Sequence, residues 1–153
     1  ILTPTLTDLV EHCQSLKVLT LKNLKMDEDQ IRVLGDDSRP DLEIVLDNCE
    51  IRSAGASALA EMLGRNQGPT KIHWCNSDHN IDNFVLANGL RGNSCLKVFT
   101  PLIRISDSNS RENCNREFLA IADALRENKG LVQLNFGHGL TVSDEEWSAI
   151  CDS

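Results

Sequence analysis

The densest group of side chains that could bind a metal lies in the segment HWCNSDH, residues 73–79. His73, Cys75, Asp78 and His79 offer nitrogen, sulfur and oxygen ligands of the kinds that zinc accepts. Two of them are expected on one face of a strand and two on the loop that follows it. No second cluster in the sequence would complete a closed tetrahedral site. We therefore predict no metal site and interpret these residues as ordinary strand and loop positions.

The sequence also lacks the motifs of nucleophilic and phosphate chemistry. It contains no GxSxG elbow and no GxxxxGK[ST] loop, and none of its cysteines stands in a recognised catalytic context. Carboxylates are plentiful in DEDQ (27–30), GDDSRPD (35–41) and SDEE (143–146). Helix capping and solvation explain these groups better than acid–base catalysis. The prediction is a protein that is not an enzyme and needs no cofactor.

The charge and composition of the chain argue against two classes of partner, nucleic acid and the membrane. The formal net charge of -8 opposes binding to nucleic acid, and no apolar run approaches the roughly 18 residues of a membrane span. Six cysteines lie far apart without a CxxC pair, which favours reduced thiols in an intracellular, cytoplasmic protein. Disulfides remain an alternative at this stage. Because the chain begins with Ile1, we expect a fragment of a longer protein.

The elements that must position any site follow an internal repeat. Asn66, Asn93 and Asn128 each stand six residues before the first aliphatic or aromatic residue of an expected strand. The segments before these asparagines carry apolar residues at i, i+3, i+4 and i+7, which is one face of a helix. The first strand residues are separated by 25, 28, 27 and 35 residues, and they are Leu19, Ile44, Ile72, Phe99 and Leu134.

Each unit is thus predicted to be a short strand followed by a helix, and neither element can bury its apolar face alone. The predicted fold class is α/β: a solenoid shaped as a right-handed horseshoe, with a parallel sheet on the concave side and helices on the convex side. The fourth unit has Pro101 at a core strand position, where proline cannot donate to a ladder. We expect that strand to be short. At the N-terminus, Thr3 or Thr5 is placed to cap an opening helix.

These residues resemble the leucine-rich repeat proteins, in particular the ribonuclease-inhibitor-like class with its unit of about 28 residues. LKVLTLKNLKM fits the pattern LxxLxLxxNxL except for Leu24 at the asparagine position, and Cys49 fills the corresponding slot of the second unit. The resemblance covers roughly residues 3–153 and implies one domain, 1–153, of about five irregular repeats. It also implies a non-catalytic interaction module or scaffold. The alternative is a regulator of an enzyme, as ribonuclease inhibitors and activators of small GTPases are.

The candidate binding surface consists of strand residues that alternate with the core pair and so face the concave side. A solvated sheet face without a ligand is the competing interpretation. The insertion 106–113 is expected to form a rim loop, either a recognition loop or a tolerated insertion. We expect a protein partner, and the negative net charge favours one with a basic surface. Self-association through the exposed ends of the solenoid is a second interaction that the sequence allows. The candidate residues are Lys22, Glu43, Val45, Asp47, Lys71, His73, Cys75, Thr100, Gln133, Asn135 and His138 on the concave face, with Asp107, Asn109 and Arg111 in the rim loop.

Overall fold

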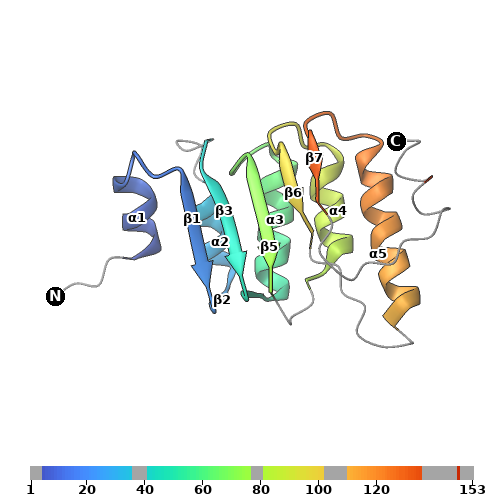
Figure 1. The fold of residues 1–153 in the computed structure, drawn as a ribbon, viewed down its shortest axis with the longest axis horizontal. Coiled ribbons are helices and arrows are strands. Elements are labelled where there is room, and N and C mark those ends of the chain that lie inside the picture. Colours follow the sequence, from blue (N-terminus) through green and yellow to red (C-terminus); the bar gives the residue numbers. More distant parts are fainter. Residues whose placement is uncertain (1–4, 36–40, 77–80, 102–109, 136–147, 149–153) are drawn as a thin grey trace.

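The chain forms two layers, a parallel sheet and a row of helices packed on one of its faces (Figure 1). The fold is taken from a computed structural model that describes residues 5–35, 41–76, 81–101, 110–135 and 148. The helices are α1 (Leu6–His12), α2 (Glu28–Leu34), α3 (Ser53–Gly64), α4 (Asn83–Arg91) and α5 (Ser110–Leu125). The strands are β1 (Val18–Lys22), β2 (Lys25–Met26), β3 (Glu43–Asp47), β4 (Glu50–Ile51), β5 (Lys71–Cys75), β6 (Val98–Thr100) and β7 (Gln133–Leu134).

The main sheet has the strand order β1-β3-β5-β6-β7, with every neighbouring pair parallel. A second, small sheet joins β2 to β4, also in parallel. The register of the main sheet places the first residues of the repeat opposite one another across all five strands, which confirms that alignment. This row is Leu19, Ile44, Ile72, Phe99 and Leu134.

The core lies between the sheet and the helices. Inward strand residues alternate with exposed ones because successive side chains of a strand point to opposite faces. Trp74 and Phe99, inward residues of neighbouring strands, pack edge to face with ring centroids 6.2 Å apart. Helix α3 meets α4 most closely at Gly89, where an added Cβ would lie 2.4 Å from the carbonyl oxygen of Ala60.

Local capping chemistry sets the helix starts. Thr5 and Asp8 form a reciprocal capping box on α1, as expected for a threonine at this end, and Asp27 and Gln30 form a second one on α2. The Asp82 carboxylate accepts hydrogen bonds from two backbone amides at the start of α4. Capping therefore explains the first part of the DEDQ cluster. No described helix has both the length and the apolar composition that a membrane span requires.

Two expectations about the fold are corrected. The solenoid horseshoe is wrong: the described chain is a small α/β domain with a short sheet, whose strands shrink from five residues in β1, β3 and β5 to three in β6 and two in β7. A horseshoe needs many regular units to accumulate its curvature, and these units are few and unequal. The proposed rim insertion 106–113 is also not all loop, because Ser110 already begins α5. The short fourth strand is confirmed, since β6 ends immediately before Pro101.

Candidate protein-binding surface

The outward face of the main sheet carries three rows of side chains that cross the strands. The register aligns them directly, because facing residues of parallel strands lie side by side. The first row is Val18, Glu43, Lys71, Val98 and Gln133; the second begins Thr20, Val45, His73 and Thr100; the third is Lys22, Asp47 and Cys75. The sequence-predicted face is thereby assembled on one side of the sheet.

A connected set of polar contacts links the first two rows. Lys71 Nζ lies 3.3 Å from one carboxylate oxygen of Glu43, and His73 Nε2 lies 3.4 Å from the other. On its other side, His73 Nδ1 lies 3.0 Å from Thr100 Oγ1. Asn135 donates from Nδ2 to the same hydroxyl at 3.4 Å. These contacts link side chains of β3, β5 and β6 with Asn135, the residue after β7.

The third row lies where the strands end. Lys22 Nζ is 2.8 Å from Asp47, and the Nδ2 of Asn76 donates to the same carboxylate at 2.8 Å. The hydrogen bonds from Lys22 and then Asn76 lower the pKa of Asp47 below its ordinary value. Beside it, burial, followed by the negative charge of Asp47, raises the pKa of the Cys75 thiol. The row is therefore charged but internally neutralised, and it offers no activated thiolate.

Three asparagines follow the strand ends in the left-handed region of backbone space, which asparagine tolerates better than most residues. Their φ values are 55° at Asn23, 51° at Asn48 and 52° at Asn76. Asn48 Nδ2 also donates to the side-chain oxygen of Asn23 at 2.7 Å. The turns after β1, β3 and β5 therefore share one backbone conformation, and the three strands end at equivalent positions of the register.

Most of the sequence-predicted site residues come together on this face. They are Lys22, Glu43, Val45, Asp47, Lys71, His73, Cys75, Thr100, Gln133 and Asn135. His138, Asp107 and Asn109 lie outside the described residues. Arg111 lies in the first turn of α5 rather than in a loop.

Sequence reasoning missed a set of ion pairs between the first two units. Lys17 contacts Asp41, Lys22 contacts Asp47 at 2.8 Å, and Lys25 lies 3.5 Å from Glu50. The signal was present in the sequence, since each lysine precedes its acidic partner by 24 or 25 residues, the spacing of the first two strands. It becomes meaningful only when the register is known.

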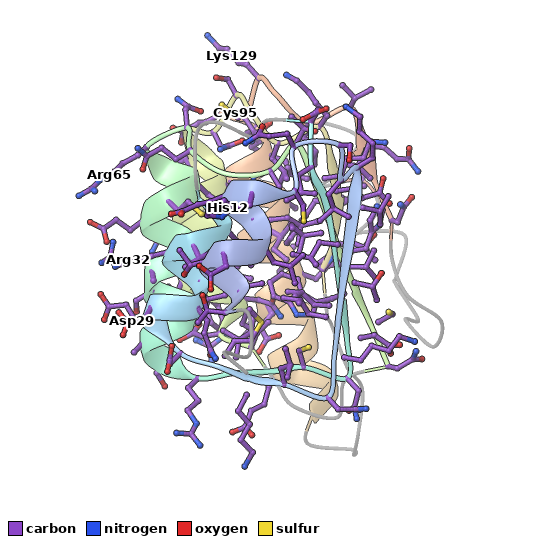
Figure 2. The ribbon with its side chains drawn as sticks, turned by 90° about the vertical axis from the view of Figure 1, so that its left-hand side faces the viewer. His12, Asp29, Arg32, Arg65, Cys95 and Lys129 are labelled. Atoms are coloured by element: carbon purple, nitrogen blue, oxygen red, sulfur yellow. The ribbon has the colours of Figure 1, made fainter. Side chains whose placement is uncertain are left out.

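The helix side carries its own ion pairs, and Figure 2 shows Arg32 and Arg65 projecting from that side. Arg32 contacts Glu28 at 2.7 Å and Glu61 at 3.2 Å, and Arg65 contacts Glu61 at 2.5 Å. A shallow hollow of about 310 Å³ lies between α1 and α2, lined by Thr7, Val10, Glu11, Arg32 and Val33. Its lining combines two valines with a salt-bridged arginine, a set without nucleophilic or metal-binding chemistry.

The described residues contain no group of three or more side chains suited to a metal ion, and Asp78 and His79 lie outside them. Among the described cysteines, Cys75 and Cys95 are free thiols. Cys49 is buried, and its Sγ lies 3.3 Å from the carbonyl oxygen of Leu21. A cysteine in this slot thus donates to a backbone carbonyl of the neighbouring strand β1.

Comparison with known proteins identifies the fold. No protein-family model matches the chain, and no curated protein sequence matches it. Among solved structures, the C-terminal domain of tropomodulin from Caenorhabditis elegans is similar with a TM-score of 0.59 and 18% identity, covering 95% of this chain and 87% of that one. A structure of leiomodin-1 actin-binding site 2 matches with a TM-score of 0.56 and 15% identity, covering 98% of this chain and 88% of that one.

These similarities overturn the family resemblance inferred from the sequence. The fold is that of the tropomodulin and leiomodin domains, so the assignment to the ribonuclease-inhibitor-like class of leucine-rich repeat proteins is wrong. The alternative of a ribonuclease inhibitor or GTPase activator depended on that class and falls with it. The physical reason is that aliphatic spacing specifies a strand, a helix and their contact, whereas different families share that unit.

Proposed function

We propose that this chain is a non-catalytic protein-binding module that recognises its partner through the outward face of the main sheet. The observation that carries the proposal is the polar network from Lys71 through Glu43, His73 and Thr100 to Asn135. Side chains that already hold one another lose less conformational entropy when a partner covers them. Val45 lies in the middle row and supplies an apolar contact at its centre.

The nature of the partner is suggested by one of the similar structures. The leiomodin-1 domain is described as an actin-binding site, so actin is the first protein to test. The formal net charge of -8 favours a basic partner surface, because opposite charge speeds association and is screened by salt. The free thiols of Cys75 and Cys95 fit a reducing, intracellular compartment.

The test is a titration of monomeric actin with the wild-type chain and with Val45→Asp and His73→Asp, followed by calorimetry. Both changes place a carboxylate in the middle row, next to Glu43, and we expect each to weaken binding at least tenfold. The matched control is Leu119→Asp, because Leu119 is 43% exposed on α5, on the opposite layer. Far-UV circular dichroism checks that each variant is folded.

The outcomes distinguish a wrong binding surface from a wrong partner protein. If actin binds and Val45→Asp and His73→Asp leave the affinity within twofold, the sheet face is the wrong surface. If Leu119→Asp is the variant that weakens binding, the helix layer is the binding surface. If the wild-type chain does not bind actin at 100 µM total protein, on the order of the weakest specific complexes, actin is the wrong partner.

A further inference from the structure

Among the described residues, β1 is the edge strand of the main sheet, and α1 lies at the same end (Figure 1). This strand is the first in the order β1-β3-β5-β6-β7, and its only ladder among the described residues is with β3. Helix α1 packs on α2 beside it, and Figure 2 looks directly at this end, with β1 alongside α1. A sheet edge presents backbone donors and acceptors that another strand can pair with.

The hydrogen bonds show which residues of β1 face outward. The carbonyl oxygen of Lys17 accepts from the amide of Glu43, and the amide of Asn23 donates to the carbonyl oxygen of Asp47. In a parallel ladder the N–H and C=O of one residue point to the same side, and successive residues alternate. Odd-numbered residues of β1 therefore bond to β3. The backbone groups of Val18, Thr20 and Lys22 point away from the sheet.

Lysines normally protect a sheet edge, because their charges repel an incoming strand. Here three lysines of the first unit are drawn to the acids of the second: Lys17 to Asp41, Lys22 to Asp47 and Lys25 to Glu50. Each positive charge is matched by a negative one on the inner side. These ion pairs reduce the repulsion that the three lysines would otherwise present to a second strand.

Apolar side chains gather at the same end. Leu9 of α1 is 36% exposed, Val18 of β1 is 46% exposed and Leu24, just after β1, is 41% exposed. These are three of the six large apolar residues exposed in the described chain. A partner at this end would therefore cover apolar surface in addition to pairing with the strand.

We propose that β1 pairs with β1 of a second copy of this chain, antiparallel and about a two-fold axis at Thr20. In this register Val18 faces Lys22 of the other copy, and Thr20 faces Thr20. Each of the three outward-facing pairs exchanges two hydrogen bonds. No lysine faces a lysine, so the edge is complementary to itself in charge as well as in backbone geometry. This inference is independent of the partner proposed above.

The pairing is expected to be weak. Five residues of strand span about 17 Å, and such an edge buries less than the roughly 1,200 Å² of stable complexes. Sedimentation velocity of the chain between 5 and 500 µM should show a monomer–dimer equilibrium with a dissociation constant on the order of 100 µM.

Thr20→Lys and Thr20→Glu place like charges opposite each other on the axis, and each should abolish the dimer. A mixture of the two variants should restore it as a heterodimer. Thr20→Pro removes the outward amide without removing a bond to β3, and it should also give a monomer. The matched control is Val132→Lys, which adds a lysine at an 82% exposed site beside β7 and should leave the dimer intact.

A wild-type chain that stays monomeric at 500 µM overturns the proposal. So does a dimer that survives Thr20→Lys and Thr20→Glu. Loss of association in both Thr20→Lys and Val132→Lys indicates head-to-tail stacking of β1 on β7, which also contradicts two-fold pairing. Restored association in the mixture supports it, because only an axis through Thr20 brings the two introduced charges together.

Discussion

The side-chain amide of Asn93 bridges two units of the fold: its Nδ2 donates to the carbonyl oxygen of Leu63 at 2.7 Å, while its Oδ1 accepts from the amide of Leu96 at 2.8 Å. Asn93 is fully buried. Asn128 does the same one unit later, bonding Leu90 and the amide of Leu131. At Asn93 and Asn128 the recurring asparagine thus joins the end of one helix to the loop that follows the next helix.

Asn93→Ala should lower the free energy of unfolding by about 1–3 kcal/mol, because it leaves the buried amide of Leu96 without its partner and removes one of the hydrogen bonds to the carbonyl oxygen of Leu63. Urea denaturation followed by circular dichroism measures the change. Asn88→Ala is the matched control, since Asn88 is exposed on α4 and alanine favours a helix. Equal midpoints for the two variants would contradict this role of Asn93.

Gly89→Ala should destabilise the chain by about 1–3 kcal/mol, because its Cβ would lie 2.4 Å from the carbonyl oxygen of Ala60 and backbone cannot yield easily. This cost exceeds the roughly 1 kcal/mol that alanine gains over glycine in a helix. Gly92→Ala, where no atom lies within 4 Å of the added Cβ, should be neutral or slightly stabilising. Thermal unfolding of both variants checks the contrast. A Gly89→Ala variant more stable than wild type would contradict this prediction, because α3 and α4 would then be able to move apart at this contact.

Glu117→Gln should make the chain more stable at pH 7. Burial raises the pKa of Glu117, opposed by the hydrogen bond from Asn83 and reinforced by the charge of Asp82. Because the folded pKa lies above the unfolded one, the stabilising contribution is present below about pH 4.5 and is lost as pH rises through the folded pKa. Urea midpoints of wild type and Glu117→Gln should therefore diverge from pH 4 to 7. Parallel curves would contradict the assignment.

Asp47→Asn should reduce the loss of stability in acid. The hydrogen bonds from Lys22 and Asn76 lower the pKa of Asp47, so its contribution is present above the unfolded value of 3.8 and is lost as pH falls through the lowered folded pKa. Wild type should lose more stability than Asp47→Asn between pH 4 and 2. Asp29→Asn, on the helix side in Figure 2, is the matched control and should follow wild type.

The local fold was predictable because it depends on neighbours along the chain. Alternation around Leu19 and Leu21, the spacing to Ile44 and the recurring asparagines all indicate which residues share a strand face or a helix end. The predicted alignment of the five strands is confirmed for this reason. Pro101 likewise ends β6 because it has no amide hydrogen to donate.

The family and the overall shape were not predictable from that pattern. A repeat of aliphatic residues defines how one unit packs on the next, but the number and regularity of the units determine whether they curve into a horseshoe. The sequence predicted which residues share the outward face of the sheet. The contact between His73 and Thr100 and the ion pairs of the lysines also depend on the register of neighbouring strands. The periodicity of the sequence alone predicts neither the contact of His73 nor these ion pairs.

The decline in strand length from β1 to β7 implies that the sheet opens unevenly. Strands of five residues at β1, β3 and β5 have more shared ladder than the three residues of β6 and the two of β7. Amide protons of β3 and β5, which have a paired strand on both sides, should consequently exchange with deuterium far more slowly than those of β6 and β7. The chain would then have one end that keeps its shape and another that a ligand could reshape without melting the whole.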